Sequence, residues 1–180
     1  MCSYCGCESE SVIKALMDDH VAISAIAGRI VDGLDRRQFG FVEPLVRELA
    51  DFFDNHRREE EAGLFAQLRD AGEARKEVER LIAEHRWLSG GLSRADIVER
   101  PGDLRRLLLA LHRHAVTEDT DLFPYAMQML PDGSWALAEE VHRRERLDAT
   151  PLIHARPVDP VGARKLYSRW VAHRPTRPEI

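Results

Sequence analysis

Two short stretches of this 180-residue chain carry the same order of possible metal ligands. Residues 56–65 and 114–123 each begin with His, have Glu four positions later and a second acid directly after it, and end in Leu-Phe. Residues four apart lie on one face of a helix, about 5–6 Å apart at Cβ, so one imidazole and one carboxylate can reach the same ion. The pairs His56/Glu60 and His114/Glu118 therefore predict two metal ions.

Two further histidines, His20 and His85, each occupy a position in an otherwise apolar helical stripe. A single histidine in such a place is usually a hydrogen-bonded core residue. Four such histidines together with two glutamates need another explanation, because each unpaired buried polar group costs about 1–3 kcal/mol and a buried charge costs more. A dinuclear metal centre would pair all four imidazoles and both carboxylates.

The ligand types narrow the choice of metal. Six nitrogen and oxygen ligands without thiolate suit iron or manganese, whereas zinc usually closes a tetrahedral site with fewer ligands. A ferritin-like site would need Glu three residues before each His. Apolar residues stand there instead, which excludes that site: Met17, Phe53, Ile82 and Leu111.

Four amphipathic segments must position these side chains, since apolar residues recur in them at three-and-four spacing. Short connections between them predict an all-α fold, an up-down-up-down four-helix bundle with a short helical C-terminal extension. The predicted helices run from an N-cap at Ser9 or Ser11 to about Gly33, from Pro44 or alternatively Phe39 to Ala71, from Glu73 into the nineties, and from Pro101 to before Pro131.

The pattern changes at Pro131. Residues 135–146 predict a short amphipathic helix, and residues 161–172 a last segment that could pack on the bundle. We therefore divide the chain into a Cys-rich N-terminal arm (1–10), a four-helix bundle (11–130) and a helical or extended tail (131–180). Three tail histidines lack a carboxylate at ligand spacing and are interpreted as ordinary structural or surface residues: His142, His154 and His173.

The composition is that of an acidic protein with a formal net charge of −5, 32% charged and 44% apolar residues. Its arginine pairs are scattered among acids, so no nucleic-acid patch is expected. No apolar run is long enough to span a bilayer, and the first residues lack the regions of a signal peptide. We expect a cytoplasmic protein that binds neither nucleic acid nor membrane.

All three cysteines, Cys2, Cys5 and Cys7, fall within the first seven residues. An odd, clustered set in a reducing compartment does not predict a disulfide framework. The spacing could hold a separate soft metal or serve thiol exchange, although the neighbourhood offers no fourth ligand for tetrahedral zinc. The alternative is a poorly ordered N-terminal arm.

The order His, His-x-x-x-Glu, His, His-x-x-x-Glu, with one element per helix and Leu-Phe after each acidic pair, resembles the hemerythrin-like HHE cation-binding family. The resemblance covers residues 13–130 and implies an oxo- or hydroxo-bridged di-iron centre. Carried over by position, the resemblance assigns His20 and His56 to one iron, and His85 and His114 to the other. It assigns Glu60 and Glu118 as the ligands that bridge the two irons.

The chain departs from the oxygen carriers of that family. The carriers have a second His on the third helix, where this chain has Leu81 or Ser89 at the matching spacing. They also use an Asp five residues after the last His; here Asp119 follows Glu118, and although helix geometry favours Glu118, both stay candidates. Candidate partners of the ligands are Glu59, Glu61 and Glu84.

The missing imidazole would leave an open position on each iron, which suits peroxide or nitric oxide chemistry better than oxygen carriage alone. We expect a non-haem di-iron protein that binds or reacts with dioxygen, hydrogen peroxide or nitric oxide, with catalase-like turnover as one form. The core helices exclude bulky substrates. The alternative is an iron, oxygen or redox sensing module that signals through its tail or Cys arm.

Overall fold

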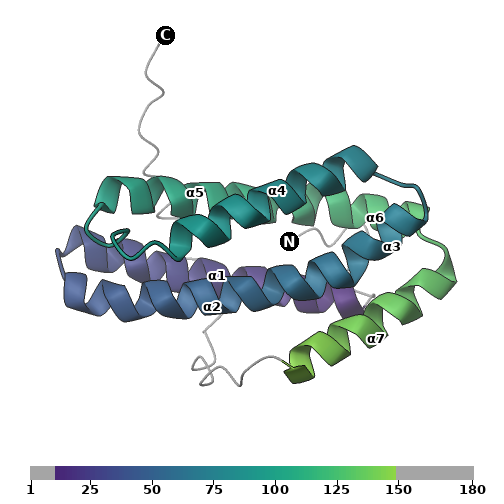
Figure 1. The fold of residues 1–180 in the computed structure, drawn as a ribbon, viewed down its shortest axis with the longest axis horizontal. Coiled ribbons are helices and arrows are strands. Elements are labelled where there is room, and N and C mark those ends of the chain that lie inside the picture. Colours follow the sequence, from purple (N-terminus) through teal and green to yellow (C-terminus); the bar gives the residue numbers. More distant parts are fainter. Residues whose placement is uncertain (1–10, 149–180) are drawn as a thin grey trace, which may run out of the picture.

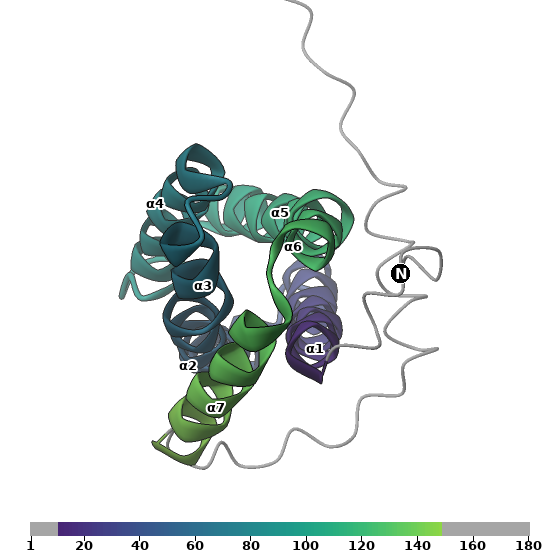
Figure 2. The same cartoon turned by 90° about the vertical axis from the view of Figure 1, so that its right-hand side faces the viewer.

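Four rods of helix, two of them interrupted, make up the part of the protein that the computed structural model describes, residues 11–148 (Figure 1). Seen end-on in Figure 2, the rods surround a common axis, and rods that follow one another in the chain are neighbours. The predicted all-α bundle is confirmed. The rods are α1 (Ser11–Asp35); α2 (Phe39–Ala62) with α3 (Leu64–Asp70); α4 (Arg75–Leu92); and α5 (Pro101–Thr117) with the π-helical turn η2 (Glu118–Leu122) and α6 (Phe123–Met129).

The core consists of two apolar clusters, one towards each end of the bundle. One cluster joins the second half of α1, the first half of α2, the end of α4 and most of α5. The other joins the first turns of α1, α3, the first half of α4, and α6. Their largest buried side chains include Phe53, Phe65 and Phe123, each of which contributes about 1.5–3 kcal/mol by leaving water. The buried histidines and glutamates of the four rods lie between the two clusters.

The second rod has one of its two predicted starts, but it is broken before its end. It begins at Phe39, the earlier of the two predicted starts, because the N–H groups of Phe41 and Val42 bond to the Gln38 carbonyl before Pro44 is reached. It then breaks at Gly63, whose φ of −90° and ψ of −95° are not helical. The predicted helix through Ala71 is thus two helices.

The fourth rod, predicted as one helix, contains the π turn η2 in its middle. Pro124 follows this turn, and a proline within a helix lacks the N–H group and crowds the carbonyl four residues earlier. The wider π turn relieves that crowding. Such turns are frequent at functional sites, and this one starts at Glu118.

The predicted tail helix is present as α7 (Asp132–Asp148), longer than expected. It packs against α1, α2 and α3 (Figure 2). Contact is close at Gly63, where a Cβ atom would lie 2.9 Å from the Glu59 carbonyl oxygen and 3.4 Å from that of Ala138. The short distance is to a carbonyl of the same rod, so glycine suits the break itself, whereas the distance to Ala138 is an ordinary van der Waals contact with α7. The predicted segment 161–172, His154, His173 and the three cysteines lie outside the described residues.

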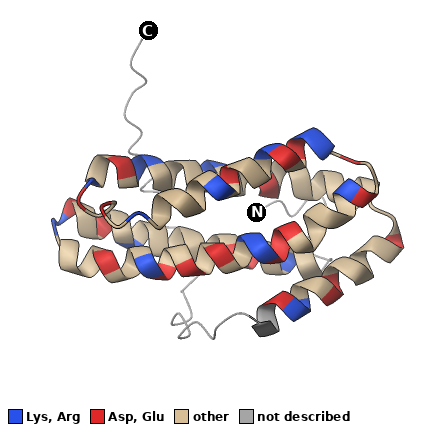
Figure 3. Cartoon of the chain, in the orientation of Figure 1, with Lys and Arg blue, Asp and Glu red and all other residues tan. Residues whose placement is uncertain are grey.

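Acidic and basic residues are interspersed along the rods (Figure 3). Many form pairs one helical turn apart, such as Glu43 with Arg47 and Lys14 with Asp18. None of the helices within residues 11–148 is long and apolar enough to cross a membrane.

Candidate metal centre

The six predicted ligands meet in the gap between the two apolar clusters. All are buried: the side chains of Glu60, His85 and Glu118 belong to residues with no exposed surface, and His20, the most exposed of the six, retains 4%. Possible ligand atoms form two groups, within each of which they lie no more than 4.8 Å apart. The groups are Glu60, His85, His114 and Glu118; and His20, His56 and Glu118.

Glu118 is the residue that belongs to both groups. Its Oε1 lies 2.9 Å from His114 Nε2 and 3.6 Å from His85 Nε2, while its Oε2 lies 3.2 Å from His20 Nε2. The His20 and His56 Nε2 atoms are 3.2 Å apart. One carboxylate therefore presents a different oxygen to each pair of histidines, which is the arrangement of a bridging ligand. Glu60 lies with His85, 3.4 Å from its Nε2.

Each imidazole also faces an acid with its outer nitrogen, Nδ1. His20 bonds Asp119 at 2.8 Å and His85 bonds Glu61 at 2.9 Å. The acid that follows each motif glutamate therefore contacts a lone histidine, which means one of the two candidate ligands, His20 and His85, that lie outside the repeated motifs. These contacts fix the ring orientation and direct Nε2 inwards, as carboxylates behind metal-bound histidines do. Asp119 thus lies behind His20, outside both groups of possible ligand atoms.

The two motif histidines are supported in the same way from the preceding rod. His114 Nδ1 lies 3.0 Å from Glu84, and His56 Nδ1 lies 3.5 Å from Asp19, a distance longer than a hydrogen bond. Both acids directly precede a lone histidine. Glu84 was among the predicted partners of the ligands, whereas Asp19 was not, although the same acid-His dipeptide could have indicated it.

One predicted partner has a different place. The Glu59 Oε2 lies 3.4 Å from His142 Nδ1 on α7, and Glu59 belongs to neither group of possible ligand atoms. His142 is 7% exposed, so it is a buried structural residue, and its acidic partner comes from α2. No local spacing within α7 could show this pair, because it depends on how the two helices pack.

The inward-facing atoms fit a bound cation. Within the described residues, both oxygens of Glu60, both oxygens of Glu118, and Nε2 of His85 and His114 are buried without a hydrogen-bond partner. His114 Nε2 and Glu118 Oε1 lie 2.9 Å apart but do not have the geometry of a hydrogen bond. Unpaired buried polar atoms are costly, and a cation among them would remove that cost. Nitrogen and oxygen donors without sulfur suit iron or manganese.

Comparison with protein families agrees with this geometry. The model of the hemerythrin HHE cation-binding domain matches residues 11–126, more than half of the chain. The chain belongs to the hemerythrin HHE family. It is therefore a metal-binding domain, and the matched span includes all six candidate ligands. The comparisons with curated proteins and with solved structures gave no match.

The electrostatics of the HHE site favour positive charge. Burial lowers the pKa of His20, but the hydrogen bond to Asp119 and the negative charges of Asp119 and Glu118 outweigh burial and raise the pKa to about 10. A similar balance raises the pKa of His85 well above its usual value. Burial raises the pKa of Glu118, yet the surrounding imidazoles hold that pKa well below the usual range. Metal ions entering the HHE site must therefore displace protons.

Aromatic rings close the HHE site on two sides. Phe65 stacks on His85 and Phe123 stacks on His20, with ring centroids 5.6 and 5.9 Å apart and planes within 3° of parallel. Each phenylalanine ends one of the two repeated motifs and covers a histidine from another rod. Phe53 meets His85 edge-on from the other apolar cluster. The Leu-Phe signature thus has a physical purpose, because it excludes water and holds the rings in place.

Proposed function

We propose that this HHE domain binds two iron ions and that the resulting protein binds or reacts with dioxygen, hydrogen peroxide or nitric oxide. The observation that carries the proposal is the pair of buried ligand groups joined by Glu118. His20 and His56 would hold one ion, and His85, His114 and Glu60 the other, with Glu118 shared. When bound, a di-iron centre supplies the redox chemistry of small oxygen and nitrogen species.

The surrounding residues support chemistry on small molecules. Asp119 and Glu61 keep the outer nitrogens of His20 and His85 engaged, which leaves each Nε2 available to a metal. Phe65 and Phe123 exclude water from those rings. The group of His20, His56 and Glu118 has one ligand fewer than the other group, so its ion would have more room for an external ligand.

Catalase-like turnover is the enzymatic form of this proposal. The test is to load the protein with iron, determine iron per chain and record the absorption spectrum before and after hydrogen peroxide, with an electrode following oxygen release. Two irons and sustained oxygen release would support turnover. Stoichiometric spectral change without release would instead favour binding, and a chain that takes up no iron under these conditions would refute the proposal.

A sensing module is the second candidate, because α7 is linked to the ligand-bearing helix. His142 of α7 contacts Glu59, the neighbour of Glu60, and α7 packs against both α2 and α3, on either side of the break at Gly63. Iron binding could therefore alter how firmly α7 is held. Hydrogen exchange of residues 132–148 with and without iron tests this, and equal protection in the two states would argue against sensing through α7.

A further inference from the structure

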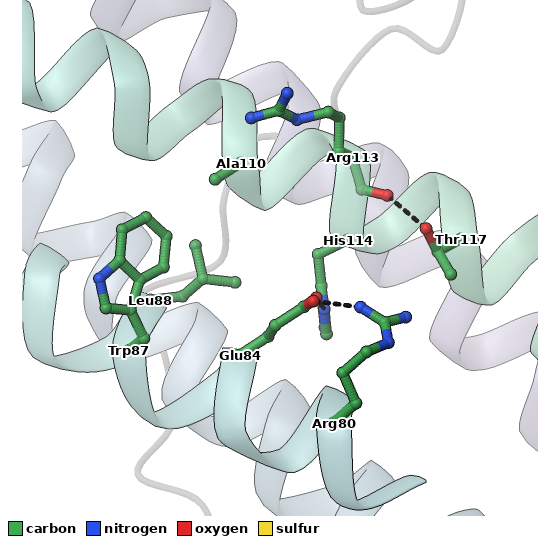
Figure 4. Close-up of a pocket in the computed structure, with 8 residues that line it drawn as sticks. All are labelled: Arg80, Glu84, Trp87, Leu88, Ala110, Arg113, His114 and Thr117. Atoms are coloured by element: carbon green, nitrogen blue, oxygen red, sulfur yellow. Dashed lines mark hydrogen bonds and ion pairs between the residues drawn. The ribbon is translucent and has the colours of Figure 1, made fainter. Parts of the chain in front are cut away.

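A pocket of about 320 Å³ lies between α4 and α5, on the outer side of the candidate metal centre (Figure 4). Glu84 and His114 lie at the centre of the view, with Trp87 and Leu88 on one side and Arg80 on the other. The same Glu84 holds the Nδ1 of His114. The pocket therefore borders the site through one hydrogen-bonded pair. Its lining is Arg80, Glu84, Trp87, Leu88, Ala110, Arg113, His114 and Thr117.

The charges that line the pocket do not balance. Arg80 pairs with both Glu77 and Glu84, so its charge is compensated within α4. Arg113 is exposed, and in the described part of the chain its guanidinium forms no ion pair or hydrogen bond. Of the two arginines that line the pocket, Arg113 is the one whose charge no acid in the described residues neutralises. A ligand with a single negative charge would neutralise it.

The walls of the pocket are apolar and partly aromatic. Trp87 is 58% exposed although it is one of the largest apolar side chains, and Leu88 and Ala110 lie beside it. An exposed indole face offers a flat surface on which a ring can stack, and covering it removes apolar area from water. The volume is at the lower end of small-molecule sites, so the ligand must be small.

We propose that this pocket binds a small planar organic monoanion, such as an aromatic carboxylate, with the carboxylate on Arg113 and the ring against Trp87. An arginine fork matches a carboxylate with two parallel hydrogen bonds. Binding itself needs no metal. A second step rests on the proposed function: because Glu84 lines the pocket and holds His114, occupancy would also change the surroundings of the iron.

Calorimetric titration of the full chain with sodium benzoate, before and after iron loading, tests the proposal. Benzoate should bind at least about tenfold more tightly than uncharged benzamide, and Arg113→Gln should weaken benzoate by a similar factor, as expected for losing a hydrogen bond to a charged group. Trp87→Leu should weaken benzoate but leave acetate unchanged. The matched control is Arg106→Gln, an exposed arginine of α5 two turns earlier and outside the pocket.

Equal benzoate affinity in Arg113→Gln and the unchanged protein, or equal binding of benzamide, would overturn the site. In iron-loaded protein, benzoate should shift the iron absorption bands, and the shift should need Arg113. A shift that persists in Arg113→Gln would mean that benzoate reaches the metal directly, which would overturn the coupling. If the chain binds no iron, the proposed function fails, but the titration before iron loading still decides whether the pocket binds an anion.

Discussion

Replacing the two buried glutamates separately should remove different numbers of metal ions. Glu118 lies in both ligand groups, whereas Glu60 lies in one. Glu118→Gln should therefore weaken both ions, and Glu60→Gln should weaken mainly the ion held with His85 and His114. Glutamine keeps the shape of the side chain and removes its charge, so the comparison concerns the carboxylate rather than packing.

The size of the effect follows from mass action. An ion present at 100 times its Kd stabilises the fold by about 2.7 kcal/mol, so two ions add about 5 kcal/mol. If a lost carboxylate weakens an ion 100-fold, its contribution at the same concentration falls to about 0.4 kcal/mol. Metal-dependent stability should then drop to about 1 kcal/mol in Glu118→Gln and to about 3 kcal/mol in Glu60→Gln.

Metal content after dialysis, together with urea unfolding with and without iron, measures these differences. Glu43→Gln is the control, because Glu43 is an exposed acid near the start of α2 and should leave both ions in place. Each variant is first unfolded without metal, so that a general loss of stability is subtracted. If Glu60→Gln and Glu118→Gln lose the same number of ions, Glu118 is not the shared ligand and the reasoning is refuted.

Three further predictions concern the residues around the site. Asp119→Asn should lower iron affinity about 10–100-fold because a neutral amide would replace the carboxylate that holds His20 Nδ1, whereas Asp121→Asn in the same π turn should not; iron titration of both variants compares them. In metal-free protein the pKa of His20 is raised from 6.5 to about 10, so its contribution to stability should be fully present below pH 6.5 and lost as pH rises towards 10. Urea unfolding of the unchanged protein and of His20→Gln across this pH range measures that contribution. A difference between the two proteins that stays constant with pH would contradict the prediction. Gly63→Ala should destabilise the fold by about 1–3 kcal/mol because its Cβ would lie 2.9 Å from the Glu59 carbonyl oxygen, whereas Gly40→Ala, with nothing within 4 Å, should be neutral or stabilising; equal thermal shifts would count against the tight backbone approach at Gly63.

The rods and the six candidate ligands could be predicted because their signals are local. An apolar stripe interrupted by His, or by His and Glu one turn apart, places those residues on the buried face whatever the neighbouring helix does. The pairing of Glu61 with His85 could also be anticipated, since an acid beside a ligand glutamate faces the next rod. In each case the periodicity of one helix was sufficient.

Other features depend on packing between helices and could not be predicted in this way. The contact of Glu59 with His142 requires α7 to lie against α2, and the stacking of Phe65 on His85 requires the second rod to bend at Gly63. The π turn depends on how a helix accommodates Pro124 next to buried ligands. Helical periodicity continues smoothly through both breaks, so it predicted one helix where the protein has two.

The contacts of the four histidines also have a symmetry. An acid-His dipeptide on one helix followed by His-x-x-x-Glu-acid and Leu-Phe on the next occurs once in α1 to α3 and again in α4 to α6. In both halves the first acid faces the motif histidine of its own half, Asp19 towards His56 and Glu84 towards His114. The last acid and the phenylalanine of each half contact the lone histidine of the other half: Glu61 and Phe65 meet His85, and Asp119 and Phe123 meet His20. A single helical hairpin with this pattern, paired with a copy of itself about a two-fold axis, would reproduce all four histidine-acid contacts. The centre can thus be understood as a duplicated half-site, with α7 against one half and an open pocket beside the other.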